Sequence, residues 1–142
     1  MNIFEKTYLG IIFESDYSDE NWIKHGSYRS IDFYIRKDGH LLKRLLQRYP
    51  DSNGRSKFTT NKIIIVLQKF IKEELKDGSS FLSRKPESGE SISFTVHAVD
   101  SNVYVAGRFK ANTGVWRCYI ATALPPEDVH YSSNDYFKEI FT

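Results

Sequence analysis

Four side chains of this sequence are of the types that cleave a phosphodiester by acid–base chemistry: His25, His40, Lys57 and Thr122. Two imidazoles that titrate near neutral pH can share the work of general base and general acid. A nearby ammonium group can stabilise the charged phosphorane. Such a set cleaves RNA without a metal, by activating the ribose 2′-hydroxyl against the adjacent phosphate. Each residue also has an ordinary structural interpretation, as a surface or strand-end side chain, and both interpretations stay open at this stage.

Guanidinium groups are available to bind the phosphates of such a substrate. The candidates are Arg44, Arg55, Arg108 and Arg117. The other two histidines, His97 in an expected strand and His130 in the tail, are predicted to be structural or incidental.

Other classes of catalytic site lack their motifs. Cys118 is the single cysteine, and no HxxxH or HExxH spacing occurs, so no metal site is expected. The glycines form no phosphate-binding loop, and no GxSxG elbow is present. The acidic residues do not cluster at a spacing typical of a two-metal site. The sequence therefore predicts chemistry without a metal or another cofactor.

Composition favours one globular domain over residues 1–142 that acts in the cytoplasm. Of the 142 residues, 40% are apolar and 27% charged, which is typical of globular proteins that bury a core. The net charge of +2 permits an anionic partner without requiring one. The longest apolar run, Ile63 to Leu67, is too short for a membrane span, and the N-terminus has no signal-peptide pattern.

The candidate residues must be positioned by helices and by a sheet. Apolar residues that alternate over 103–108 and 115–121, with a turn at Asn112 to Gly114, predict an antiparallel hairpin whose second strand ends on Thr122. A strand over 91–97 precedes it, so three consecutive strands are expected to form a meander over 91–126. Helical spacing predicts one helix from Asp38 to Tyr49 and a longer one from Thr59 or Thr60 to Gly78.

The expected fold is α+β, with N-terminal helices packed on a C-terminal antiparallel β-meander. Its parts are an N-terminal segment (1–37), a helical part (38–78), the sheet (91–126) and a tail (127–142). Short strands are expected at Tyr8 to Phe13 and at Ile31 to Ile35, and the aromatic segment from Tyr136 to Phe141 is expected to dock on the sheet.

Two segments of the chain resemble the second half of the bacterial EndoU-type ribonucleases: GRSKFTTNKIIIVLQKFI and VYVAGRFKANTGVWRCYIATALP. They are similar more broadly to the barnase–EndoU–colicin–RelE group of metal-independent ribonucleases. The resemblance implies that His25 and His40 are base and acid, that Lys57 binds or stabilises the phosphate, and that Thr122 contacts the substrate. The ending TALP is also similar to the RNase A-like toxin domains of contact-dependent inhibition systems, in which Arg44 would match an arginine.

Two functions follow as hypotheses. The first is an endoribonuclease of the toxin or phage-effector kind, with RNA as substrate and a cognate inhibitor protein as a further partner. The second is a non-catalytic protein-binding module, such as an immunity protein or a phage inhibitor. Convergence of His25, His40, Lys57 and Thr122 on one cleft would favour the first, whereas separate surfaces would favour the second.

Overall fold

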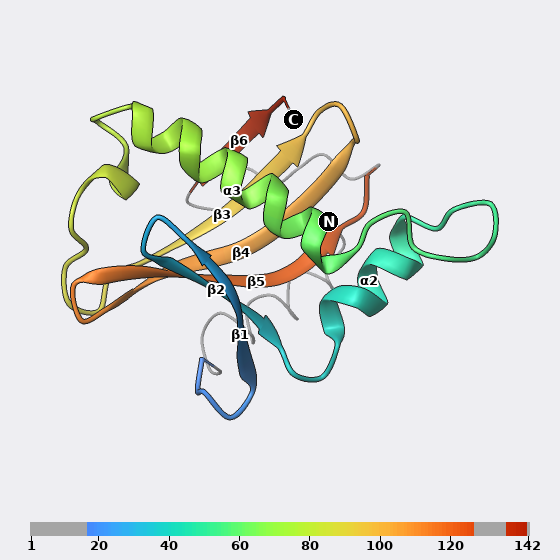
Figure 1. The fold of residues 1–142 in the computed structure, drawn as a ribbon, viewed down its shortest axis with the longest axis horizontal. Coiled ribbons are helices and arrows are strands. Elements are labelled where there is room, and N and C mark those ends of the chain that lie inside the picture. Colours follow the sequence, from blue (N-terminus) through green and yellow to red (C-terminus); the bar gives the residue numbers. More distant parts are fainter. Residues whose placement is uncertain (1–16, 127–135, 142) are drawn as a thin grey trace.

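The chain folds into a six-stranded mixed sheet with two α-helices, as a computed structural model shows for residues 17–126 and 136–141 (Figure 1). The elements in chain order are β1 (Trp22–Tyr28), β2 (Ile31–Arg36), α2 (His40–Arg48), α3 (Thr60–Lys76), the 3-10 turn η1 (Phe81–Ser83), β3 (Ser91–Ala98), β4 (Val103–Asn112), β5 (Val115–Leu124) and β6 (Tyr136–Ile140). The strand order is β1-β2-β5-β4-β3-β6. The α+β class expected from the sequence is thereby confirmed.

The predicted meander forms the middle of the sheet. β3 pairs antiparallel with β4, and β4 pairs antiparallel with β5. The turn between β4 and β5 uses Thr113 and Gly114, both at positive φ, as the hairpin pattern requires. Both strands lie mostly in the interior, because their β-branched and aromatic side chains pack on both faces of the sheet.

The predicted order of helices first and sheet last differs from the structure, because the sheet begins at Trp22. The β1–β2 hairpin precedes both helices, and β2 lies parallel to β5, with Ile35 opposite Ile120. The crossover from β2 to β5 contains α2, α3, β3 and β4, which gives it ample length for a parallel connection. β2 itself was expected. β1 was not, because its alternation is weak and Trp22 is its one buried residue.

The aromatic tail docks on the sheet as predicted, and it does so as a strand. β6 pairs parallel with β3, so that Val96 lies opposite Lys138. The buried carboxylate of Glu74, in α3, accepts a hydrogen bond from the Tyr136 hydroxyl at 2.7 Å and forms an ion pair with Lys138. The expected strand at Tyr8 to Phe13 lies outside the described residues.

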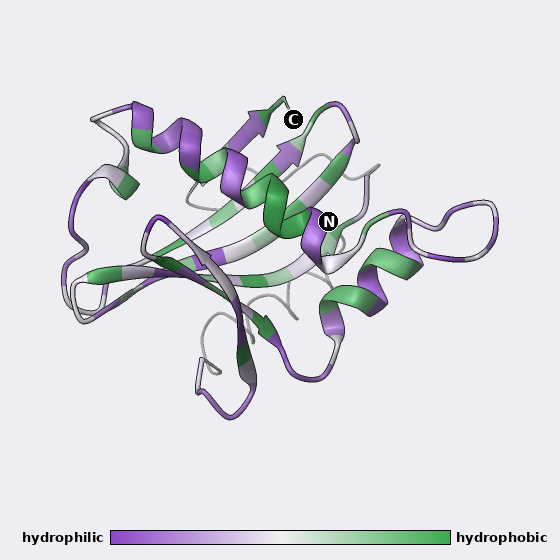
Figure 2. Ribbon diagram, in the orientation of Figure 1, coloured by the Kyte–Doolittle hydropathy of each residue, from purple (hydrophilic) through white to green (hydrophobic). Residues whose placement is uncertain are grey.

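α3 covers one face of the sheet (Figure 1). Its predicted apolar stripe is buried, with Ile63, Leu67 and Phe70 fully enclosed in the main core. Figure 2 shows hydrophobic and hydrophilic residues alternating along this helix, as expected for an element with one buried side. Trp22, Tyr34 and Tyr119 belong to a second, smaller cluster of buried residues.

α2 lies beside the end of β5 (Figure 1). Leu41 and Leu45 are buried against the main core, whereas Leu42 and Leu46, which share the same apolar pattern, are exposed. A nine-residue helix that touches the body of the protein along one side cannot bury all four leucines.

Candidate functional site

The junction between α2 and β5 brings together two of the residues singled out in the sequence. His40 Nε2 lies 3.1 Å from Thr122 Oγ1, although the two residues are 82 positions apart in the chain. Both are buried: the His40 residue is 6% exposed, and Thr122 is fully enclosed. We call this contact the His40–Thr122 pair.

The sequence around His40 fixes the start of α2. Gly39 adopts a left-handed conformation with φ of 75°, and Asp38 accepts a hydrogen bond from the His40 N–H at 3.0 Å. Burial acts to raise the pKa of Asp38, but the His40 N–H and the Arg36 guanidinium outweigh it and hold the pKa below its usual value. An ionised Asp38 therefore fixes the backbone of His40, the first residue of α2, and with it the starting position of the imidazole.

A β-bulge determines where Thr122 points. Gly107 pairs with Ile120 and Ala106 with Thr122, so that Ala121 is an extra residue in β5. Strict alternation would put Thr122 on the same face as Ile120, in the main core. The bulge instead sets Thr122 opposite Ala106, a member of the smaller cluster, where its hydroxyl meets the imidazole.

Two further side chains of the α2 region hold the residues that follow Thr122. Arg48 Nη1 donates to the carbonyl oxygen of Ala123 at 2.5 Å, and the Tyr49 hydroxyl donates to that of Leu124 at 2.6 Å. The Tyr49 hydroxyl also accepts from the backbone N–H of Tyr104 at 3.1 Å. The end of β5 is thus bound to α2 at three successive residues, which gives the His40–Thr122 pair a rigid setting.

His40, Arg44 and Arg48 occupy one face of α2, because they are spaced four residues apart. Arg44 Nη1 donates to Gln47 Oε1 at 2.5 Å, while Arg44 Nε is buried and has no hydrogen-bond partner among the described residues. A buried, unpaired guanidinium N–H is costly unless an acceptor arrives, and an anionic oxygen is the strongest acceptor it can receive.

Lys57 lies close to this junction. Its backbone N–H donates to the Tyr49 carbonyl oxygen at 2.8 Å, and its side chain is exposed. Lys57 and Arg48 both line a hollow of about 180 Å³ beside the end of β5. The remaining residues of its lining are Tyr49, Pro50, Ser101, Asn102 and Pro126. Lys57 therefore lies at the same end of the sheet as the His40–Thr122 pair, but the lining of its hollow includes neither His40 nor Thr122.

His25 occupies a different place. It lies in β1, where its Nε2 is 3.2 Å from Asn61 Oδ1 in the first turn of α3. Within residues 17–126 and 136–141, no hydrogen bond or ion pair joins His25 to the His40–Thr122 pair. The structure therefore does not bring the two imidazoles into contact.

The remaining predicted arginines do not join the junction either. Arg55 is exposed in the loop after α2. Arg108 donates to Ser91 Oγ at 2.8 Å along the sheet. Arg117 lies over the Tyr34 ring at 4.7 Å and is five residues, or about 16 Å of extended strand, before Thr122.

Both ring nitrogens of His97 have hydrogen-bond partners, which agrees with the structural role predicted from the sequence. Its Nδ1 lies 3.0 Å from Glu139 Oε2 and its Nε2 lies 2.8 Å from Asn102 Oδ1, and the ring stacks on Tyr104. Through Asn102 it supports one wall of the hollow that Lys57 lines. His130 lies outside the described residues.

Sequence reasoning missed Arg48 and Tyr49 as parts of the site. The four-residue spacing of His40, Arg44 and Arg48 was a signal that could have revealed Arg48. The role of Tyr49 depends on its contacts with β5 and β4, for which the sequence holds no local signal.

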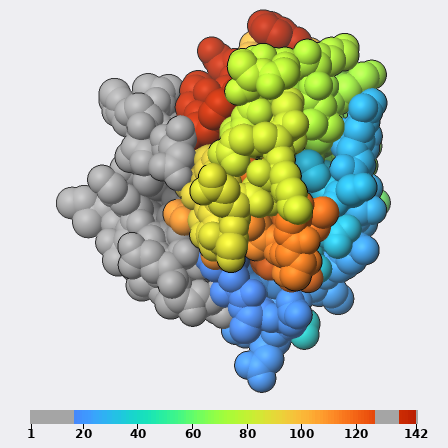
Figure 3. Space-filling model, turned by 90° about the vertical axis from the view of Figure 1, so that its left-hand side faces the viewer, coloured from blue at the N-terminus to red at the C-terminus, as the bar shows by residue number. Residues whose placement is uncertain are grey.

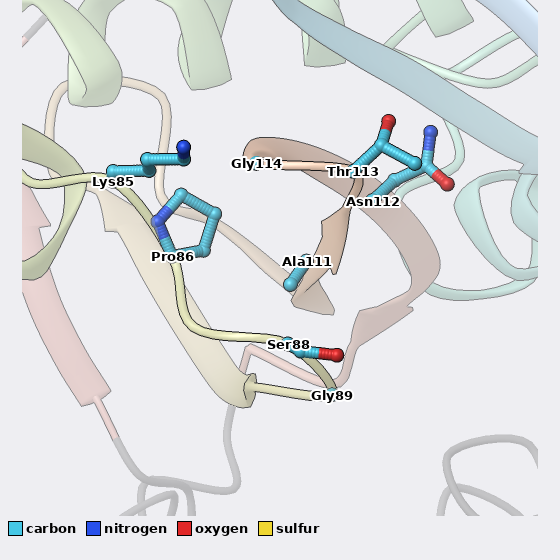
Figure 4. A pocket seen from close by; sticks show the side chains of 8 residues that line it. All are labelled: Lys85, Pro86, Ser88, Gly89, Ala111, Asn112, Thr113 and Gly114. Carbon is cyan, nitrogen blue, oxygen red and sulfur yellow. The ribbon is translucent and has the colours of Figure 1, made fainter.

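A larger hollow, of about 410 Å³, lies at the opposite end of the sheet between the tip of the β4–β5 hairpin and the loop before β3 (Figures 3 and 4). Lys85 is its one ionisable lining residue, so it offers little for acid–base chemistry. Among the described residues, no group of three or more His, Cys, Asp and Glu side chains could hold a metal ion. Neither described helix is long and apolar enough to cross a membrane.

Comparison of the chain with protein-family models, with curated proteins and with solved structures found no match.

Proposed function

We propose that the protein is a metal-independent endoribonuclease of the toxin or phage-effector kind, with its site where α2 meets β5. The observation that carries this proposal is the contact of 3.1 Å between His40 Nε2 and the Thr122 hydroxyl, beside Arg44, Arg48 and Lys57. An imidazole beside a hydroxyl, with cations on the same helix face and at the same end of the sheet, matches the needs of phosphodiester cleavage by an internal hydroxyl.

In the proposed reaction, the ribose 2′-hydroxyl loses its proton to the His40 imidazole and its oxygen attacks the adjacent phosphorus. A cyclic 2′,3′-phosphate forms, and the bond to the 5′-oxygen of the next nucleotide breaks. That oxygen takes a proton from a solvent water, because His25, the other acid–base residue that the resemblance names, lies against Asn61 and not beside the pair. Thr122 orients the imidazole, since its hydroxyl lies at hydrogen-bond distance from Nε2.

The cations have a separate role. Negative charge grows on the non-bridging oxygens of the phosphorane, and donors aimed at those oxygens lower the barrier. Arg44 offers its unpaired Nε, and Lys57 offers an exposed ammonium on the hollow that it shares with Arg48. Their positive charges also favour entry of a polyanion at this end of the sheet.

The decisive experiment incubates purified protein with RNA in the presence of EDTA and detects fragments that end in 2′,3′-cyclic phosphate. His40→Asn should reduce the rate by about 100-fold or more, because an amide can hold the Thr122 hydroxyl but cannot exchange a proton near neutral pH. Lys57→Ala should also slow cleavage. Lys85→Ala is the matched control, because it removes a cation from the opposite end of the sheet and should leave the rate unchanged.

The alternative function, a non-catalytic protein-binding module, has its own outcome in this experiment. It would be supported by folded wild-type protein that produces no cyclic-phosphate ends and binds a protein partner tightly. Equal cleavage by wild type and His40→Asn would also contradict the proposed site, because the activity would then come from elsewhere.

A further inference from the structure

We propose that the outer face of α3 is a track for single-stranded RNA that leads into the hollow lined by Lys57. The inference deepens the proposed ribonuclease function by naming its substrate as an unpaired strand. Binding to the track can nevertheless be measured without cleavage.

The first observation is a stripe of exposed residues on α3: Lys62, Ile65, Lys69 and Lys72. Their spacing of three and four residues places them on one side of the helix, away from the buried stripe of Ile63 and Leu67. Ile65 is 58% exposed, a large apolar side chain in the middle of three lysines. We call these four residues the α3 stripe.

The second observation is the charge of the α3 stripe. Within the described residues, no carboxylate lies at ion-pair distance from Lys62, Lys69 or Lys72, so their charges are not neutralised by a neighbour; the described lysines that do have such partners are Lys24 and Lys138. Lys57, which is exposed, adds a further ammonium group before the start of the helix, and no described carboxylate pairs with it. Regularly spaced cations of this kind suit the regularly spaced phosphates of one nucleic-acid strand.

The third observation is a series of three hollows that share lining residues. The hollow of Lys57 meets a second one, of about 280 Å³, at Ser101. The second hollow meets a third, of about 210 Å³, at Ile65. The second is lined by Phe58, Lys62, Ile65, Val66 and Ser101, and the third by Tyr28, Ile65, Gln68, Lys69 and Lys72. The series follows α3, which lies in front of the sheet in Figure 1.

The second and third hollows are lined by the same kinds of side chain. The second and third hollows each combine an aromatic ring, Phe58 or Tyr28, with at least one lysine and a neutral hydrogen-bonding side chain. Unpaired bases stack on such rings while lysines contact the phosphates. Duplex RNA hides its base faces, so it could not use the rings. Separate small hollows also suit single flat bases better than the continuous groove that a helix or strand of a protein partner needs.

The test measures binding of a fluorescent, single-stranded 2′-O-methyl RNA of about ten nucleotides. This RNA cannot be cleaved by the proposed reaction, because it has no free 2′-hydroxyl. Fluorescence anisotropy over a series of salt concentrations gives the affinity and its salt dependence. The double variant Lys62→Glu with Lys69→Glu should bind at least tenfold more weakly, and its log–log salt slope should fall by about 2. The matched control is Lys37→Glu with Lys85→Glu, which makes the same change in net charge away from α3 and should alter affinity less than about threefold.

A further variant tests the rings. Phe58→Leu keeps apolar volume against Tyr49, on which Phe58 packs edge to face, but removes the stacking surface. It should weaken binding about fivefold or more. Unchanged unfolding transitions of all variants would show that binding, and not folding, has changed.

The proposed track would be wrong if the wild-type protein showed no salt-dependent binding, or if the two double variants lost the same amount of affinity. It would also be wrong if duplex RNA bound as tightly as the oligonucleotide, or if poly-glutamate bound more tightly. The last result would assign the α3 stripe to an acidic protein partner. Retained binding of the oligonucleotide by a wild-type protein that cleaves no RNA would instead contradict the proposed ribonuclease function and leave the track standing.

Discussion

The His40–Thr122 pair should behave as one buried unit whose two halves depend on each other. Thr122→Val replaces the hydroxyl with a methyl group of similar size, so it leaves His40 Nε2 buried without its partner at 3.1 Å. His40→Leu removes the imidazole from the Thr122 hydroxyl, which keeps only its 3.3 Å contact with the Ala123 carbonyl oxygen. Each single change should lower the free energy of unfolding by about 1–3 kcal/mol, the cost of a buried polar group that has lost its hydrogen bond.

The double variant should cost less than the sum of the two single variants. Once both polar partners are gone, no unsatisfied group remains from this contact, so the coupling energy should be about 1–2 kcal/mol. Any contribution of His40 that does not involve Thr122 cancels in the cycle. Urea unfolding followed by the fluorescence of the buried Trp22 and Trp116 measures all four proteins.

The matched control is the contact between His25 Nε2 and Asn61 Oδ1, which has a similar length of 3.2 Å but lies at the surface. The corresponding cycle with His25→Leu and Asn61→Leu should give a coupling energy of less than about 0.5 kcal/mol, because water replaces the lost partner. If the His40–Thr122 coupling were no larger than this, the argument that β5 and α2 are held together by a buried polar contact would be wrong.

Three other changes test the surrounding fold. Gly107→Ala places a Cβ atom 2.1 Å from the Tyr119 carbonyl oxygen, so thermal or urea unfolding should show a loss of about 3 kcal/mol or more; a near-neutral effect would contradict the strand packing at the bulge. Glu74→Gln removes the buried partner of Lys138 and should cost about 2–3 kcal/mol, with faster hydrogen exchange in β6 than in β4. The pKa of Glu90 is lowered to about 2, chiefly by its hydrogen bond from Arg84. The ionised carboxylate therefore stabilises the folded state fully above its ordinary pKa of 4.5, and this stabilisation is lost as the pH falls through about 2. The stability difference between wild type and Glu90→Gln should therefore be largest near neutral pH and shrink towards zero at pH 2, and a difference that grows with acid would refute this assignment.

Much of the fold could be predicted because its signals are local. Period-two alternation with a turn at Gly114 was enough for the β4–β5 hairpin, and helical spacing was enough for α2 and α3. The same signals correctly placed His40 at a helix start, but they ended the second strand on Thr122, whereas β5 continues to Leu124. Each of these predictions depends on side chains within one element, whose spacing directly reports which side is buried.

The missed features involve partners that are distant in the chain. The parallel pairing of β2 with β5 is decided by how the intervening helices and strands pack, and β1 was missed because it buries little besides Trp22. His25 was expected beside His40, but it meets Asn61 instead. Pattern reasoning could not anticipate this, because the twist and register of strands determine which loops and edges become neighbours.

Residue types and spacing alone were sufficient to specify the α+β class, the meander and the acid–base character of the candidate side chains. Tertiary packing decided which of them meet. One extra residue at Ala121 turns Thr122 towards the imidazole of His40, and packing of α2 against β5 brings Arg48 and Lys57 to the same end of the sheet. The physical reason is that local backbone geometry sets the direction in which a side chain points. Burial of the whole core instead decides which distant residues become its neighbours, as with His40 and Thr122, which are 82 positions apart.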